Sequence, residues 1–86
     1  MEFEFDSRKS LSNKRKHGID FIEAQRLWDD TARVELPARM SDESRYVVIG
    51  RIEGKHCSEI VTYRGERVRI ISVRRARSEE VEIYEG

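Results

Sequence analysis

Arginines dominate residues 64–77, which hold six of them with one acid and no lysine. The planar guanidinium group can bind two oxygens of one phosphate, which the ammonium group of lysine cannot do. If the intervening apolar residues form a strand, Arg67 and Arg69 project from one face about 7 Å apart. Arg64 then lies at the preceding turn, and Arg74 lies at the far end of the strand. Such a group could bind an RNA phosphodiester and stabilise the charge that develops on it during cleavage.

The same arginines could instead form ion pairs, because charge is abundant and segregated along the 86-residue chain. Lysine and arginine number 17, aspartate and glutamate also number 17, and the formal net charge is zero. Residues 8–17 and 64–77 each carry a net charge of +5, whereas residues 20–30 carry −3 and residues 78–86 carry −4. These blocks can produce a positive surface on a neutral protein. They also let the arginines pair with acidic helices, and the sequence leaves both interpretations open.

Three further side chains could transfer protons. The imidazole of histidine ordinarily titrates at a pH of about 6.5. His17 could therefore serve as a general acid or base, or it could cap free carbonyl groups at the end of a helix. Glu80 and Tyr84, one helical turn apart, could supply acid–base chemistry near the arginines. Alternatively, Glu80 caps a helix or pairs with Arg77, and Tyr84 packs beside Val81.

Composition argues against several classes of site and protein. The single cysteine, Cys57, cannot form an internal disulfide, which agrees with a reducing cytoplasm. Cys57 and the two histidines lack the spacing of a zinc site, and the five glycines stand singly, unlike a phosphate-binding loop. The longest apolar run is far below the roughly 20 residues of a membrane span, and the acidic start lacks the features of a signal peptide. We therefore expect a cytoplasmic domain with no metal, cofactor or membrane anchor.

The first part of the chain predicts a short strand and a helix. Residues 3–5 alternate between apolar and acidic side chains, which favours a strand. Asp6 can cap a helix over about 7–16, whose one strong apolar anchor is Leu11. Basic residues in the last turn suit the negative end of this helix, and Gly18 is a natural residue just past it.

A second helix is predicted from Asp20 to about Thr31. Asp20 and Glu23, three positions apart, have the spacing of a capping box. Helical periodicity brings apolar side chains to one face, which should pack against a sheet. This face comprises Phe21, Ala24 and Trp28, with Leu27 beside them.

The remainder predicts four strands and a final helix. Two apolar residues alternate before Pro37, which suggests a short edge strand, and residues 38–44 should form a polar loop. Gly54 and Gly65 mark two tight turns, so the strands that they join must be antiparallel. We expect one α+β domain over residues 1–86, with two N-terminal helices packed on an antiparallel sheet and the order β-α-α-β-β-β-β-α. The longer strands cover about 45–52, 57–63 and 67–74, and Ser78 caps a helix over about 79–85.

The last strand, residues 67–74, does not divide into an apolar face and a polar face. Its odd-numbered positions combine two arginines with Ile71 and Val73, and its even-numbered positions combine Val68 and Ile70 with a serine and an arginine. Two explanations remain open. Helices cover the sheet on both sides, with the C-terminal helix on the second, or a β-bulge at or just after Ile71 reverses the alternation.

Motifs along nearly the whole chain resemble those of the BrnT toxins, a family from bacterial type II toxin–antitoxin modules. Residues 13–21 resemble the family's N-x-x-KHG-hydrophobic-x-F motif, and residues 45–50 resemble R-aromatic-x-x-IG. Residues 69–76 resemble RIISAR-x-A, and Glu80 with Tyr84 fits an E-x-x-x-Y ending. The order and spacing of the KHG and RIIS-x-R motifs make this resemblance specific.

This resemblance implies a RelE-like fold and a ribonuclease that inhibits translation. In that chemistry a ribose 2′-OH attacks the adjacent phosphate without a metal ion, arginines stabilise the developing charge, and a side chain assists proton transfer. The resemblance also implies neutralisation by a BrnA-type antitoxin with a ribbon-helix-helix domain. The toxin would contact the DNA of its operon only through that antitoxin.

The same resemblance implies a set of catalytic residues. Among them, Arg64, Arg69 and Arg74 would bind phosphate. His17 or Glu80 would carry the proton. The sequence departs from the family at Val61, where histidine is frequent, and at Val81, where arginine is frequent. The missing histidine at position 61 and the neutral net charge support an alternative of another class, a non-catalytic toxin-like protein that acts mainly as the antitoxin's partner in an autorepressor complex. The implied catalytic set is Lys16, His17, Arg64, Arg69, Arg74 and Glu80.

Overall fold

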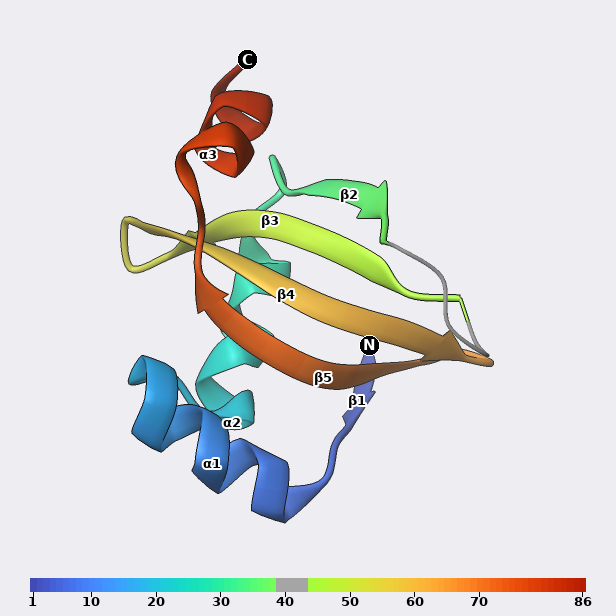
Figure 1. Ribbon diagram of the computed structural model, residues 1–86. Coiled ribbons are helices and arrows are strands. Elements are labelled where there is room, and N and C mark those ends of the chain that lie inside the picture. Colours follow the sequence, from blue (N-terminus) through green and yellow to red (C-terminus); the bar gives the residue numbers. More distant parts are fainter. Residues whose placement is uncertain (39–43) are drawn as a thin grey trace.

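The computed structural model describes residues 1–38 and 44–86 (Figure 1). It confirms the α+β class, because the described residues form a five-stranded sheet and three α-helices. Most of the loop predicted over 38–44 lies outside the described residues. In chain order the elements are β1 (Glu2–Glu4), α1 (Ser7–His17), α2 (Phe21–Ala24), the 3-10 helix η1 (Gln25–Asp29), β2 (Val34–Pro37), β3 (Tyr46–Ile52), β4 (Lys55–Arg64), β5 (Arg67–Arg75) and α3 (Ser78–Glu85).

The sheet has the spatial order β1-β5-β4-β3-β2. Strands β2 to β5 pair antiparallel, as their short connections predict. The expectation of a wholly antiparallel sheet is wrong at β1, which pairs parallel with β5. Because more than 60 residues separate β1 from β5 in the sequence, no tight turn fixes their relative direction. Strand β2 lies at the sheet edge, as its proline predicts.

Helices α2 and η1 cover one face of the sheet and lie behind it in Figure 1. The predicted capping box is present, since the Asp20 carboxylate accepts the Glu23 N–H and the Glu23 carboxylate accepts the Asp20 N–H. The single helix predicted after it is instead four residues of α-helix followed by η1. The buried apolar residues of this segment recur every three positions. This spacing favours a 3-10 helix over a continued α-helix, because a 3-10 helix aligns side chains three positions apart. The side chains so aligned and buried are Phe21, Ala24 and Leu27.

Helix α1 is capped by Asp6 and ends at Gly18 in the left-handed conformation, both as predicted. Its predicted anchor is wrong, because the Leu11 side chain is 61% exposed. The buried side chains of α1 are instead polar, those of Ser10 and Asn13. This reversal has a physical cause: α1 lies along the edge of β5, where backbone N–H and C=O groups need hydrogen-bond partners.

A β-bulge in β5 explains the mixed pattern of that strand. Ile60 of β4 lies opposite Ser72, but the next residue, Val61, lies opposite Ile70, so Ile71 is the extra residue. The buried side chains of β5 accordingly change from even to odd numbers: Val68, Ile70 and Val73 all face α2 and η1.

The bulge therefore places Arg74 on the same side of the sheet as Arg67 and Arg69. Unbulged β4 confirms this, because its partners Ser58, Thr62 and Arg64 lie opposite Arg74, Arg69 and Arg67, and even-numbered positions of one strand share a face. We call this side, opposite α2 and η1, the second face. Of the two explanations that the sequence left open, the structure confirms the bulge, which places Arg74 on the face that carries Arg69.

Helix α3 covers one end of the second face and contacts β3 (Figure 1). The helix was predicted at this position, but Ser78 is its first residue and not its cap. The residue before the helix is Arg77, whose N–H donates to the Glu80 carboxylate. No described helix is both long and apolar enough to cross a bilayer.

Candidate functional site

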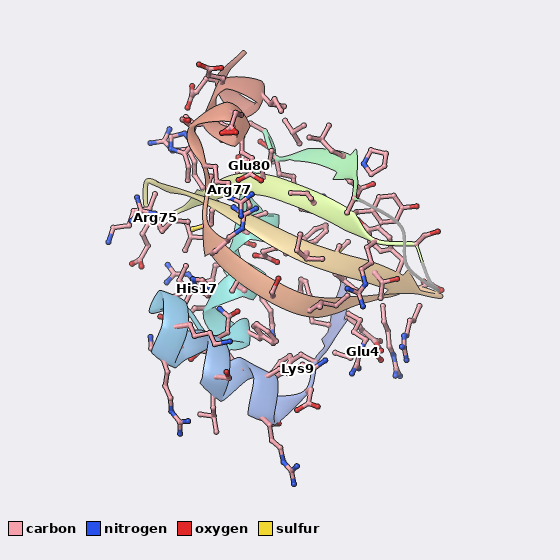
Figure 2. The ribbon with its side chains drawn as sticks, viewed as in Figure 1. Glu4, Lys9, His17, Arg75, Arg77 and Glu80 are labelled. Atoms are coloured by element: carbon pink, nitrogen blue, oxygen red, sulfur yellow. The ribbon has the colours of Figure 1, made fainter. Side chains whose placement is uncertain are left out.

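Arg74 and Glu80 form a two-pronged ion pair on the second face. Arg74 Nη1 donates to Glu80 Oε1 at 2.7 Å, and Nη2 donates to Oε2 at 2.9 Å. Ser58 Oγ and the Arg77 N–H donate to the same carboxylate at 2.9 and 2.8 Å. Figure 2 shows Arg77 and Glu80 side by side at the start of α3. Four hydrogen bonds from three residues therefore hold this carboxylate in one orientation.

These contacts set the charges of the pair. The hydrogen bonds from Arg74 lower the pKa of Glu80 to about 2, although partial burial acts in the opposite direction. The pKa of Arg74 is raised, chiefly by its hydrogen bonds to Glu80. Glu80 is consequently an anion over the whole neutral range, and a carboxylate of such low pKa is a weak base. Its contacts suit it to orienting the Arg74 guanidinium.

The Arg74 guanidinium keeps a second fork for another ligand. Its two terminal nitrogens point at Glu80, and Nη1 also donates to the Arg75 carbonyl at 3.3 Å. An arginine has five N–H groups. Among the described residues, no partner occupies Nε–H or the second N–H of Nη2. This pair of donors has the bidentate spacing that matches two oxygens of a phosphate.

A second arginine group surrounds Glu4 of β1. The Glu4 carboxylate lies 3.4 Å from Arg69 Nη1 and 3.7 Å from both Arg67 Nη1 and Arg64 Nε. Arg67 also contacts Glu2, 3.2 Å from its Nε. Three guanidinium groups thus converge on the carboxylates of Glu2 and Glu4. Arg74 pairs with an acid of helix α3, whereas these carboxylates belong to strand β1.

Lys16 and His17 lie at the end of α1, beside the edge of β5. They line a shallow groove of about 210 Å³ between the helix and the strand. Figure 2 shows His17 and Lys9 along the same helix. Ser72 lines the groove from the strand and stands two residues before Arg74. The remaining lining residues are Lys9, Ser12, Asn13 and Ile71.

The predicted site residues therefore form three groups. Arg74 and Glu80 touch, and Lys16 and His17 lie beside the same end of β5. Arg69 is five residues from Arg74, about 15 Å along the strand, and lies with Arg64 near Glu4. A single phosphate cannot contact both arginine groups, whereas an extended RNA strand can.

Sequence analysis missed two polar contributors to this region. Ser58 donates to Glu80, and nothing in the sequence sets it opposite Arg74 before the strand register is known. Asn13 binds the backbone of β5, and its signal was available, since Ser10 and Asn13 stand three positions apart on one side of the first helix.

Other candidate groups have structural partners. Tyr84 Oη donates to Asp30 at 2.6 Å, so it turns away from Glu80. His56 Nε2 lies 2.6 Å from a Glu85 carboxylate oxygen. Burial raises the pKa of the Cys57 thiol, which makes it a poor nucleophile. Within the described part of the chain, no three metal-ligating side chains come together.

Comparison with known proteins identifies one family. Residues 5–80 match the sequence model of a family described as ribonuclease toxin, BrnT, of type II toxin–antitoxin systems. The match covers most of the chain and includes every predicted site residue. It confirms the resemblance that the motifs indicated. None of the curated proteins matches the sequence significantly.

Proposed function

The chain belongs to the BrnT family of ribonuclease toxins of type II toxin–antitoxin systems, and from this membership we propose that it cleaves RNA without a metal ion. In the proposed reaction a ribose 2′-OH attacks the adjacent phosphorus, and the bond to the 5′-oxygen of the next nucleotide breaks. The products are a 2′,3′-cyclic phosphate and a 5′-hydroxyl. The observation that carries the proposal is the second fork of Arg74, held in place by Glu80.

Arg74 is the proposed phosphate ligand at the cleaved bond. Negative charge grows on the non-bridging oxygens as the 2′-OH attacks, and a preoriented guanidinium stabilises that charge more than it stabilises the ground state. Removing one such donor typically slows catalysis about 100- to 1,000-fold. Glu80 is then a positioning residue, because its contacts are with Arg74 and with the start of α3.

His17 is the favoured proton carrier of the two that sequence analysis left open. The low pKa of Glu80 makes that carboxylate a weak base at neutral pH. His17 lies in the groove that Ser72 also lines, next to the end of β5 that carries Arg74. In this arrangement Lys16 contacts the phosphate backbone, and Arg64 and Arg69 hold a more distant part of the RNA strand.

The proposal extends to the partners of this chain. We propose a RelE-like ribonuclease fold, inhibition of translation through RNA cleavage in the cytoplasm, and neutralisation by a ribbon-helix-helix antitoxin of the BrnA type. Such an antitoxin would cover the positive second face, since acidic side chains there would compete with RNA phosphates. DNA would be contacted through the antitoxin.

The non-catalytic alternative rests partly on Val61, where the family resemblance leads us to expect a histidine, and partly on the neutral net charge. The Val61 side chain is fully buried in the core that α2 and η1 cover, and Arg74 lies on the other side of the sheet. A histidine at position 61 would face the core, so its loss removes no group from the proposed site.

The proposal is tested with purified protein and 5′-labelled RNA in the presence of EDTA, both free and in a translating extract. We expect cleavage in at least one setting, with 2′,3′-cyclic phosphate and 5′-hydroxyl ends. A substrate with 2′-O-methyl groups should resist cleavage, because it lacks the attacking hydroxyl. Products with 5′-phosphates, or cleavage that depends on added Mg²⁺, would contradict the mechanism. A folded protein that cuts in neither setting would contradict the function.

A further inference from the structure

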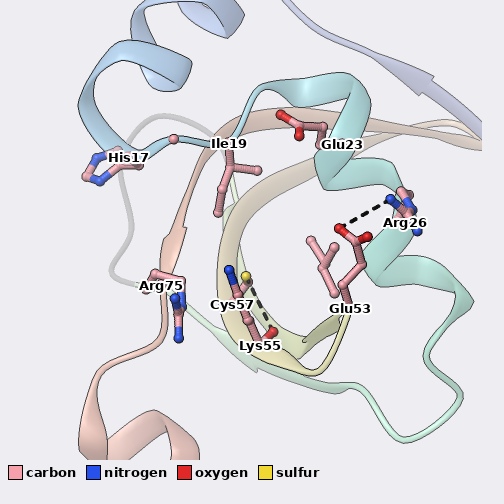
Figure 3. Close-up of a pocket in the computed structure, with 10 residues that line it drawn as sticks. His17, Ile19, Glu23, Arg26, Glu53, Lys55, Cys57 and Arg75 are labelled. Atoms are coloured by element: carbon pink, nitrogen blue, oxygen red, sulfur yellow. Dashed lines mark hydrogen bonds and ion pairs between the residues drawn. The ribbon is translucent and has the colours of Figure 1, made fainter.

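A cavity of about 310 Å³ lies between the end of α1, the start of α2 and the β3–β4 turn (Figure 3). This volume is at the lower end of the range of about 300–1,000 Å³ that is typical of small-ligand sites. Such a space suits one compact group and excludes a larger ligand. The cavity is separate from the Arg74–Glu80 pair, since neither residue lines it.

The lining of the cavity combines an apolar floor with a cationic rim. Ile19 and Ile52 form the floor, next to the uncharged Cys57 thiol. Lys55 and Arg75 belong to the rim, and both side chains are drawn in Figure 3. Among the described residues, neither rim side chain has an ion-pair partner. A ligand that complements this site has a flat apolar part and an anionic part.

The acidic side chains of the cavity do not neutralise the positive charge of Lys55 and Arg75. Glu23 is paired with Lys14 at 2.7 Å, and this contact is the main reason that its pKa is lowered. Glu53 lies 3.6 Å from Arg26. Each carboxylate therefore has its own cation, and the positive charge of Lys55 and Arg75 is left for a ligand.

The cavity is continuous with the proposed RNA path at two places. His17 lines both the cavity and the groove between α1 and β5. Arg75 directly follows Arg74, and successive side chains of a strand point to opposite faces. The Cα atoms of Arg74 and Arg75 are about 3.8 Å apart. Arg74 lies on the second face, whereas Arg75 lines the cavity. A phosphate bound at Arg74 and a group bound at Arg75 would therefore lie at adjacent residues on opposite faces of the sheet.

We propose that this cavity is a nucleotide subsite, which holds the base next to the cleaved phosphodiester on Ile19 and Ile52 and its phosphate on Lys55 and Arg75. The inference rests on the proposed ribonuclease function and adds a place where base identity is read. It predicts that cleavage depends on the base at one fixed position beside the cut.

Binding of free nucleotides tests the subsite without requiring cleavage. Each of the four nucleoside 5′-monophosphates is titrated into isotope-labelled protein, with inorganic phosphate and free nucleosides as separate probes. We expect at least one nucleotide to shift the amide signals of Ile52 and Cys57 and to bind more tightly than either probe. The double variant Lys55→Glu/Arg75→Glu should bind about tenfold more weakly or worse, because it loses charge-assisted contacts.

The matched control is Arg15→Glu, an exposed α1 position that lines neither the groove nor the cavity. It should bind nucleotide like the wild type, because its altered charge lies outside the site. Equal weakening in the control and the double variant would overturn the subsite, as would the absence of shifts at the cavity.

Mapping of cleavage sites in a random RNA pool separates the subsite from the ribonuclease function. Wild type and Arg15→Glu should share a base preference at one position, and the double variant should lose that preference. Nucleotide binding at the cavity by a wild type that cuts no RNA would overturn the function and keep the subsite. Cleavage with the same preference in all three proteins would overturn the subsite and keep the function.

Discussion

The side chain of Asn13 binds both backbone groups of Val73, 60 positions later in the chain. Asn13 Nδ2 donates to the Val73 carbonyl at 2.8 Å, and the Val73 N–H donates to Asn13 Oδ1 at 3.2 Å. The same Nδ2 also donates to the Ile19 carbonyl at 2.8 Å. Asn13 thus takes the place of a neighbouring strand at the β5 edge. It fixes Lys16 and His17 beside the end of the strand that carries Arg74.

Asn13→Ala should destabilise the domain by about 2–4 kcal/mol. The change leaves one N–H and two carbonyl groups without a partner, and a buried unsatisfied group typically costs about 1–3 kcal/mol. Urea unfolding at pH 7 measures the effect. Ser12→Ala, an exposed neighbour on α1, should stay within about 0.5 kcal/mol of the wild type. Equal midpoints for Asn13→Ala and Ser12→Ala would show that the contact does not stabilise the fold.

Leu27 and Leu11 provide a matched pair of leucines in different surroundings. Leu27 is fully buried against the sheet, whereas Leu11 is 61% exposed. Leu27→Ala should cost about 2–5 kcal/mol, because it leaves a cavity in the core. Leu11→Ala should cost less than about 0.5 kcal/mol. The unfolding midpoints of the two variants decide between this packing and the opposite orientation of α1.

Glu59 is a buried acid on the core side of β4. Its Oε1 accepts a hydrogen bond from Trp28 Nε1 at 3.3 Å, and its Oε2 has no hydrogen-bond partner among the described residues. Burial raises the pKa of Glu59 from 4.5 to about 8, and the Trp28 contact acts in the opposite direction. The folded protein therefore holds a proton at neutral pH that the unfolded chain has released.

Stability should fall as the pH rises from about 4.5 to about 8, because the folded state binds more protons than the unfolded state across that interval. The difference in pKa corresponds to an upper limit of roughly 5 kcal/mol. Glu59→Gln mimics the protonated acid and should remove this fall, so its advantage over the wild type grows with pH. Thermal unfolding at several pH values measures it. A constant difference between the two proteins would contradict the buried neutral acid.

Glu80→Gln and His17→Gln distinguish positioning from proton transfer. Glu80→Gln should lower the maximal cleavage rate, because the Arg74 guanidinium loses its charged anchor, and it should keep the shape of the pH profile. His17→Gln should change the shape of that profile, because it removes the proposed proton carrier. The reverse result, in which the glutamate variant alone changes the shape, would assign the proton to Glu80.

Local signals predicted much of the fold. The caps at Asp6, Asp20 and Gly18 depend on neighbouring residues alone, and the structure confirms all three. The prediction that Leu11 anchors α1 is wrong, because the sequence does not show that α1 meets a strand edge, where polar groups are needed.

Long-range register explains why the site was only partly predicted. Residue types identified Arg74 and Glu80, but the bulge at Ile71 decides which face Arg74 occupies. Strict alternation would put Arg74 on the other face, and the sequence left open whether a bulge reverses it. The contact between Ser58 and Glu80 joins two residues 22 positions apart, so no local pattern could indicate it.

The central claim is that Arg74 serves an RNA-cleaving site, and growth after tightly controlled expression in a bacterium tests it most directly. Wild type, Arg74→Ala, Arg74→Lys and the exposed control Arg15→Ala are compared, with total RNA analysed and folding checked by thermal unfolding. The account predicts growth arrest and RNA cleavage with the wild type and Arg15→Ala. It predicts normal growth and intact RNA with both Arg74 variants, since the ammonium group of lysine cannot form the planar two-nitrogen fork of arginine. Arrest and cleavage by folded Arg74→Ala at the wild-type level would contradict the claim.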